Sequence, residues 1–365
     1  MNREIYQKRW GRAREKMREG DIAALLLVPS TDLYYLTGFR GHISDRFTGF
    51  LLTLEGAFFL YPAFEKNRIN PELLDSAECL PHRDGEDPYG MFTGLLPRKD
   101  GIIASDTRIW GSVLLSLQER VPKARWLDAG KILIPLRIEK DEGEYGLLRE
   151  AQGMAALGLE ELYKWGLEGR SEKEAAAKLT EFCAQAGLEQ ADWGPIVASG
   201  PNGASPHHVS GDRLILPGDP VVIDFGGVHG GYQADMTRTP VIGKAGDEFK
   251  AVYETVLAAN QAAFGAAKPG TPCEAVDTAA RDLIGRAGYG EYFNHRLGHG
   301  IGLDLHEDPY MVKGNTRLIR PGMAFSDEPG IYLPGKFGVR IEDILFMGEK
   351  EAERLTPFPH QLREL

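Results

Sequence analysis

Two aspartates stand close together in a segment typical of a β-hairpin. The strand-like stretches Val221–Phe225 and Tyr232–Thr239 flank a glycine-rich turn. A two-residue turn at His229-Gly230 would place Asp224 directly opposite Asp235, and like charges at opposed positions destabilise a sheet. The pair therefore predicts a neutralising partner: a shared proton, an arginine or a bound cation. A register shifted by one residue would make the two positions diagonal but still close, and an off-centre turn would leave one aspartate in solvent.

Histidines form a second candidate group. Six of the nine lie between His207 and His306. Glycines flank His299 on both sides, so its backbone can bend and its imidazole can approach a ligand closely. Its spacing from His306 is not that of the helical His-Glu-x-x-His metal motif. A hydrogen-bonded core histidine is the alternative interpretation of His299.

Two glutamates come next, in strand-like surroundings. Proline and glycine come directly after Glu328 and should end a strand there. The stretch Val339–Met347 is predicted to be one strand, whose alternation puts Arg340 and Glu342 on the same face. A carboxylate in an apolar strand is costly unless it is paired or bound to a metal. A buried salt bridge to Arg340 or another cation is the alternative for Glu342.

Together these candidates comprise two aspartates, one histidine and two glutamates, with no cysteine. Oxygen-rich sets of this kind suit Mn²⁺, Co²⁺ or Zn²⁺ in a two-metal site better than a structural zinc. In such a site the two ions lie about 3.5–4 Å apart and share bridging carboxylates.

The elements that must position these side chains divide into two parts, with a boundary expected at 130–140. The first part alternates strands and helices as a small α/β domain does; we expect strands at 23–28, 50–54, 57–61 and 101–105 and a helix at 110–120. The second part should begin with a long helix through Tyr163. A capping box at Ser171 and Glu174 begins the next helix, which ends near Gly187. Thr271 as N-cap, Pro272 as first residue and Glu274 as capping glutamate predict another, ending near Gly288. The remaining strands are expected at 221–225, 232–239, 323–326 and 339–347.

Composition excludes several classes of protein. The 365 residues are 42% hydrophobic, and 44 glycines with 22 prolines are too few for a collagen-like or low-complexity chain. A net charge of −11 argues against a nucleic-acid-binding face. Three cysteines without a Cys-x-x-Cys pair suit a reducing compartment. The longest apolar run near the N-terminus, Ile22–Val28, is far too short to span a membrane. We therefore expect a cytoplasmic protein that binds neither nucleic acid nor membrane.

The motifs, in this order, resemble the pita-bread-fold metallopeptidases, in the branch of Xaa-Pro dipeptidase (prolidase) and aminopeptidase P. The match runs from about Arg137 to Leu365, through Ser199-Gly200-Pro201-Asn202, Pro206-His207, the Asp224–Thr239 hairpin, His299-Gly300-Ile301-Gly302, Glu328-Pro329-Gly330-Ile331-Tyr332 and Arg340-Ile341-Glu342-Asp343. The first part resembles the creatinase/prolidase N-terminal domain in size and in Tyr35-Leu36-Thr37-Gly38-Phe39. The resemblance implies an α/β N-terminal domain over residues 1–135 and an α+β pita-bread catalytic domain over 136–365.

The resemblance also implies roles by position. Asp224 would hold one metal, His299 and Glu328 the other, and Asp235 with Glu342 would bridge both. Glu328 would also accept the proton of the attacking water. His207 and His306 would bind substrate and steady the tetrahedral intermediate, Arg340 would orient a ligand carboxylate, and His295 would lie near the substrate pocket. His208 adjoins His207, and only the Pro-His pattern favours His207 as the functional one.

The implied activity is hydrolysis of the Xaa-Pro amide bond in dipeptides or short peptides with proline at the second position. Two divalent ions per chain, Mn²⁺ first and Co²⁺ or Zn²⁺ as alternatives, would supply a bridging hydroxide that attacks the scissile carbonyl. A homodimer is expected, with the loop Arg40–Arg46 either reaching the partner's site or lying on the surface.

Four other functions compete with this one. Aminopeptidase P activity on longer Xaa-Pro peptides belongs to the same branch. Methionine or general aminopeptidase activity is disfavoured by the extra N-terminal domain. A non-catalytic pita-bread peptide-binding module, or a metal-free amidinohydrolase, would usually have lost metal ligands, and all five are present here.

Overall fold

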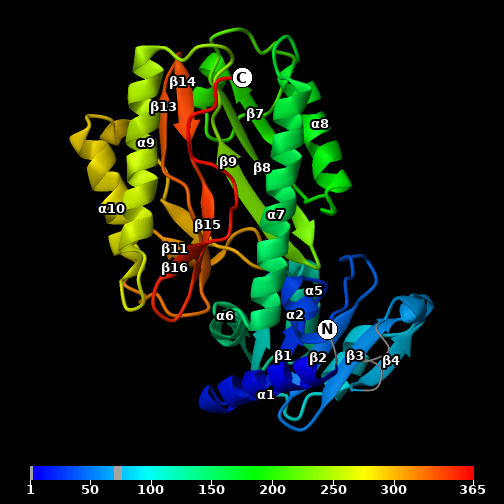
Figure 1. Ribbon diagram of the computed structural model, residues 1–365. Coiled ribbons are helices and arrows are strands. Elements are labelled where there is room, and N and C mark those ends of the chain that lie inside the picture. The colour runs from blue at the N-terminus through cyan, green and yellow to red at the C-terminus, as the bar shows by residue number, and fades with distance from the viewer. Residues whose placement is uncertain (1–2, 70–75) are drawn as a thin grey trace. The chain divides into compact units, whose positions relative to one another are not determined.

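The computed structural model describes residues 3–69 and 76–365 (Figure 1). Contacts divide the chain into two compact units, Met1–Arg137 and Ile138–Leu365. Among the described residues, no helix is both long enough and apolar enough to cross a membrane.

The first unit is built on a mixed six-stranded sheet in the order β4-β3-β2-β1-β5-β6. Strands β1, β2 and β3 pair antiparallel, while β4, β5 and β6 join parallel to their neighbours. The predicted strands and helix of this part are confirmed to within a residue or so. Its helices are α1 (Arg3–Glu19), α2 (Thr31–Thr37), α4 (Pro88–Gly94), α5 (Gly111–Arg120) and α6 (Gly130–Arg137); its strands are β1 (Ile22–Leu27), β2 (Gly49–Thr53), β3 (Ala57–Pro62), β4 (Glu78–His82), β5 (Ile102–Ser105) and β6 (Arg125–Asp128).

The second unit contains a three-stranded sheet β7-β8-β9, a five-stranded sheet β11-β10-β12-β15-β16 and a β13-β14 pair. Helices α7 and α8 lie beside the first sheet, and α9 and α10 lie beside the other strands (Figure 1). The helices are α7 (Glu142–Trp165), α8 (Glu172–Gln185), α9 (Asp247–Ala266) and α10 (Cys273–Arg286). The strands are β7 (Ile196–Ser199), β8 (Val221–His229), β9 (Tyr232–Arg238), β10 (Gly298–Gly300), β11 (Glu307–Met311), β12 (Ala324–Asp327), β13 (Gly330–Leu333), β14 (Phe337–Arg340), β15 (Asp343–Met347) and β16 (Ala352–Arg354).

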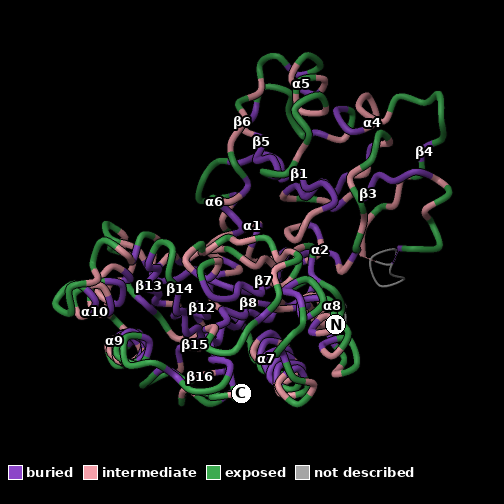
Figure 2. Tube along the Cα trace, turned by 90° about the horizontal axis from the view of Figure 1, so that it is seen from above, coloured by how far each residue is buried: buried purple, intermediate pink, exposed green. Residues whose placement is uncertain are grey.

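Two apolar cores hold the second unit together. One packs α7 and α8 on β8 and β9 and includes Leu159, Leu179 and Phe225. The other packs α9 and α10 on the remaining strands and includes Val256 and Phe325. Figure 2 shows β8, β12 and β15 as buried trace between α7 and α9. Strands covered on both faces form a rigid support for polar side chains at their ends.

Of the two helix starts predicted from capping residues, one is confirmed and one is wrong. The box at Ser171 and Glu174 is confirmed. The predicted start of α10 is wrong by one residue: Pro272 is the N-cap, in extended conformation, and no side chain caps the helix. Glu274 instead accepts a hydrogen bond from the Gly314 backbone N–H at 2.9 Å. A proline cannot donate from its backbone, so it suits the cap position as well as the first turn.

The hairpin turns one residue later than predicted. Gly230 and Gly231 form the turn, with φ of +57° and +95°, and His229 pairs with Tyr232. A turn at His229-Gly230 would have forced histidine into the left-handed region that a two-residue turn of this kind demands. Asp235 therefore lies opposite Gly226, and Asp224 lies opposite Thr237. The two aspartates are diagonal neighbours on one face rather than a directly opposed pair.

The single strand predicted at Val339–Met347 is wrong, because the chain changes sheets within it. Strand β14 pairs with β13, and β15 pairs with β12 and β16. Between them the backbone N–H of Glu342 bonds to the carbonyl of Thr237 on β9 at 3.1 Å. Glu342 thus sits at the junction of the sheets, which aims its carboxylate at the hairpin.

Candidate active site

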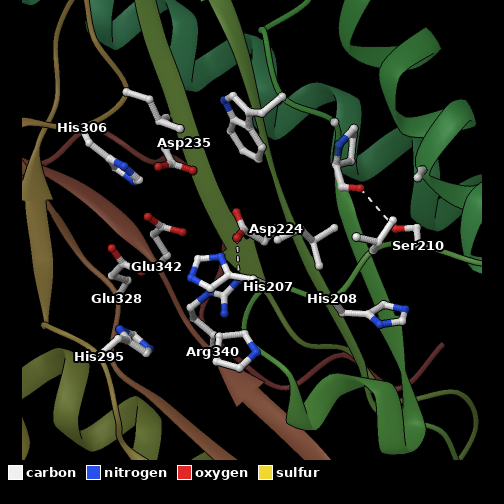
Figure 3. Close-up of a pocket in the computed structure, with 18 of the residues that line it drawn as sticks. His207, His208, Ser210, Asp224, Asp235, His295, His306, Glu328, Arg340 and Glu342 are labelled. Atoms are coloured by element: carbon white, nitrogen blue, oxygen red, sulfur yellow. Dashed lines mark hydrogen bonds and ion pairs between the residues drawn. The ribbon is translucent and has the colours of Figure 1, made fainter.

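A cavity of about 1020 Å³ in the second unit gathers every side chain that the sequence assigned to metal binding, catalysis or substrate binding. In Figure 3 the carboxylates and the imidazole of His306 face a common space beside β8. Strands β8, β9, β10 and β14, the residue that follows β12, the junction at Glu342, and the loops around His207 and His295 supply these side chains. The predicted residues there are His207, Asp224, Asp235, His295, His299, His306, Glu328, Arg340 and Glu342.

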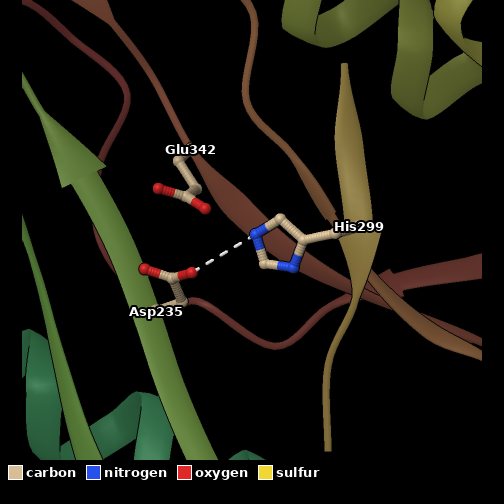
Figure 4. Close-up of side chains that lie close together, drawn as sticks. All are labelled: Asp235, His299 and Glu342. Carbon is tan, nitrogen blue, oxygen red and sulfur yellow. Dashed lines mark ion pairs between the residues drawn. The ribbon is translucent and has the colours of Figure 1, made fainter. Parts of the chain in front are cut away.

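Three of these residues are close enough to share one ion. Asp235, His299 and Glu342 are buried, and one ligand atom from each lies within 4.8 Å of the other two (Figure 4). His299 Nε2 is 3.6 Å from Asp235 Oδ2 and 3.3 Å from Glu328 Oε1. The imidazole therefore stands between one carboxylate from β9 and one from the residue that follows β12.

A backbone carbonyl fixes the role of one ring nitrogen of His299. Its Nδ1–H donates to the carbonyl of Gly300 at 3.1 Å, which leaves Nε2 facing the carboxylates. Nε2 can face two carboxylates either as the N–H of a protonated ring or, in a neutral ring, with a cation bound between the nitrogen and the oxygens. The serine hydroxyl of Ser326 accepts from the His299 backbone N–H at 3.0 Å and donates to Glu328 Oε1 at 3.1 Å.

Burial and mutual repulsion disfavour the ionised forms of two of the carboxylates. Burial raises the pKa of Asp235 well above its usual value, and the charge of Asp224 raises it further. Burial likewise raises the pKa of Glu342, with Asp235 adding to the effect. Burial would also raise the pKa of Glu328, but the hydrogen bond and charge of His299 lower it to about 2. This donor set, hard oxygens plus one imidazole, fits divalent cations.

Arg340 is a buried cation that the chain itself places beside Asp224. Its Nη2 donates to Asp224 Oδ2 at 2.5 Å, its Nη1 to the Tyr332 hydroxyl at 2.8 Å and its Nε to the Thr237 hydroxyl at 3.1 Å. Burial raises the pKa of Asp224, and the charge of Arg340 opposes that rise. The guanidinium is thus held by the protein's own groups on three of its nitrogens.

The histidines of the cavity differ in what they are free to do. The ring of His306 packs edge-on against His299 with centroids 4.1 Å apart. Burial and the charge of His299 lower its pKa to about 4, so it is neutral at pH 7. His295 has both nitrogens engaged, donating from Nδ1 to the Arg296 carbonyl and accepting at Nε2 from the Tyr332 hydroxyl at 2.9 Å.

His207 and His208 also differ from each other. His208 Nε2 donates to Glu172 at 2.7 Å, whereas His207 is exposed and faces the cavity (Figure 3). Both side chains line the cavity.

Sequence reasoning missed three residues that shape this site. Thr237 donates to Glu342 Oε2 at 2.6 Å, Tyr332 bonds Arg340, and Glu172 bonds His208. Thr237 lies two residues from Asp235 and therefore on the same strand face, a signal that was available. Nothing in the spacing of Glu172 connects it with His208.

Comparison with known proteins yields two family matches and close relatives. The metallopeptidase family M24 model matches residues 146–349, and the creatinase/prolidase N-terminal domain model matches residues 9–138. The chain is 38% identical to the probable dipeptidase PepE of Mycobacterium tuberculosis, over 98% of this chain and 96% of that protein. It is 33% identical to a Xaa-Pro dipeptidase of Pyrococcus horikoshii, over 95% of this chain and 96% of that protein. A prolidase structure from Thermococcus sibiricus superposes with a TM-score of 0.94 at 34% identity, over 99% of both chains.

Proposed function

The chain belongs to metallopeptidase family M24, and on that premise we propose that it is a Xaa-Pro dipeptidase. The expected fold class, an α/β domain followed by an α+β pita-bread domain, is confirmed. The observation that carries the proposal is the convergence of four carboxylates and one imidazole in a single cavity. Relatives named Xaa-Pro dipeptidase, similar over nearly the whole chain, support the substrate class.

We propose that Asp224, Asp235, His299, Glu328 and Glu342 hold two divalent cations, with Mn²⁺ as the first choice. Their oxygens and the Nε2 atom of His299 are the donors that such ions prefer. Divalent ions bound there supply Lewis acidity and a water of lowered pKa.

The remaining polar residues would bind and orient the peptide. Neutral His306 can accept or donate a hydrogen bond beside the cluster, and His207 lines the same cavity. Arg340 was expected to orient a ligand carboxylate. Because its nitrogens bond Asp224, Thr237 and Tyr332, we propose instead that it fixes the Asp224 carboxylate. His295 would act through Tyr332 rather than on the substrate.

Aminopeptidase P activity is the second candidate, because a cavity of about 1020 Å³ offers more room than a dipeptide requires. We further propose that residues 1–135 restrict the length of the peptide and that the protein works as a cytoplasmic homodimer. Three free cysteines suit a reducing compartment. The Arg40–Arg46 loop remains the segment expected to approach the partner.

An assay of the Mn²⁺-supplemented enzyme with Ala-Pro, Ala-Pro-Gly and Ala-Ala tests the proposal. Cleavage of Ala-Pro alone is the result expected of a Xaa-Pro dipeptidase. Cleavage of Ala-Pro-Gly in preference would assign the aminopeptidase activity. Failure to cleave either proline substrate, with metal shown to be bound, would refute both.

A further inference from the structure

The carboxylate of Glu172 is buried outside the metal-binding cluster, next to the loop that carries His207. Glu172 is the first residue of α8, and its side chain has no exposed surface. Its Oε1 accepts from the Ser199 backbone N–H at 2.8 Å, the Ser199 hydroxyl at 2.7 Å and the Asn202 amide at 2.9 Å. All three donors precede His207 in the chain.

The other oxygen of this carboxylate bonds to residues that come after His207 in the chain. Glu172 Oε2 accepts from His208 Nε2 at 2.7 Å and from the Gly211 backbone N–H at 3.2 Å. The backbone N–H of Lys173 donates to the Gly211 carbonyl at 3.0 Å. Both ends of the loop therefore meet on one carboxylate at the start of a rigid helix.

These contacts are strong enough to hold the loop. Burial would raise the pKa of Glu172, but hydrogen bonds from Ser199, Asn202 and His208 outweigh it and lower the pKa. A charged, fully bonded carboxylate forms stronger hydrogen bonds than a neutral group does. Leaving such a charge without one of its donors is costly.

His207 has no comparable support of its own. Within the described part of the chain its ring makes no hydrogen bond that would orient it, and 205–210 contains neither helix nor strand. The direction of the ring is therefore set by the loop backbone. That backbone is tied on one side through Asn202 and on the other through His208.

We propose that Glu172 and His208 are positioning residues that hold the 205–210 loop so that His207 faces the cavity. The catalytic part of this inference rests on the proposed function, whereas the loop clamp does not. It assigns the two adjacent histidines different tasks: His207 meets the substrate, and His208 holds His207 in place.

The test compares His208→Leu, which removes the donor, with His208→Gln, whose amide can still donate to Glu172. The turnover number for Ala-Pro should fall about 10- to 100-fold in His208→Leu and stay close to wild type in His208→Gln. In a His207→Ala background, His208→Leu should add little, because residues that act as one unit are not additive. Mn²⁺ stoichiometry should not change. His229→Leu is the control, since His229 also pairs with a glutamate, Glu150 at 3.0 Å, but in an exposed position at the hairpin end.

Hydrogen exchange provides a readout without turnover. Peptides covering 199–213 should exchange faster in His208→Leu and Glu172→Gln than in wild type or His229→Leu, while 221–238 should not change. Unchanged exchange in 199–213 would overturn the clamp, and fully additive losses in the double mutant would overturn its action through His207. If the wild type cleaves no Xaa-Pro dipeptide, the proposed function fails, and exchange alone still decides the clamp.

Discussion

The hydroxyl of Thr237 joins Arg340 to the buried Glu342: it accepts from Arg340 Nε at 3.1 Å and donates to Glu342 Oε2 at 2.6 Å. The backbone carbonyl of Thr237 also accepts from the Glu342 N–H at 3.1 Å. One residue of β9 therefore fixes both the position and the rotamer of Glu342. Groups that orient a metal ligand in this way tune its affinity for the ion.

Thr237→Val keeps the shape of the side chain and removes only the hydroxyl. We expect Mn²⁺ binding to weaken about 10- to 100-fold, because Glu342 loses its donor and becomes free to rotate. Calorimetric titration with Mn²⁺ measures the change. Thr237→Ser, which retains the hydroxyl, should bind nearly as tightly as the wild type; equal affinity for the valine variant would remove Thr237 from this role.

The three thiols should react slowly in the folded protein. Burial raises the pKa of Cys79 and Cys273 to about 11 and that of Cys183 to about 12. Only the thiolate is a nucleophile, so alkylation at pH 8 should be slow and should speed up about tenfold per pH unit. All three should react at once in guanidinium, and a fast native thiol at pH 8 would contradict the expectation.

The same shifts predict how stability changes in alkali. The usual pKa of a cysteine thiol is 9.0, so between about pH 9 and 11 the unfolded chain releases thiol protons that the folded chain retains. Because the folded state binds more protons there, the free energy of unfolding should fall as the pH rises. Urea unfolding at a series of pH values, with Cys183→Ala as comparison, measures this fall; a smaller fall in the variant is expected.

Ser171→Ala should destabilise the second unit by about 1 kcal/mol, since it removes the N-cap of α8. Ser171 accepts from the Glu174 N–H at 3.3 Å and donates to its carboxylate at 2.7 Å. Urea unfolding followed by circular dichroism gives the value. Thr278→Ala, on the exposed face of α10, should change stability by less than about 0.5 kcal/mol. A similar loss in both would show that the cap contributes nothing specific.

Local signals in the sequence were sufficient for much of the fold. The capping box of α8 depends on two residues three positions apart and has the predicted form, and strands β2 and β3 lie within a residue of their predicted bounds. The predicted cap of α10 is wrong because Glu274 accepts a hydrogen bond from the backbone N–H of Gly314, forty residues later in the chain. Local propensity cannot anticipate such a contact.

The cavity could be assembled from the sequence only as a set of residue types. That Asp224, Asp235 and Glu342 lie together followed from their chemistry and from the family resemblance. The way in which these residues meet could not be predicted. The register of the β8–β9 hairpin depends on Gly230 and Gly231, which adopt the positive φ that the turn requires. The break between β14 and β15 at Glu342 depends on a contact with Thr237, which lies over a hundred residues earlier in the chain. The Glu172–His208 pair depends on a loop whose sequence has no periodic pattern.

Anomalous diffraction from crystals soaked in Mn²⁺ tests the central claim most directly. We predict two peaks per chain about 3.5–4 Å apart, with Asp235 and Glu342 between them, His299 and Glu328 at one and Asp224 at the other. In crystals of Glu342→Ala, one or both peaks should disappear. A single peak elsewhere in the chain, or two peaks that survive in the variant, would contradict the assignment of these five residues.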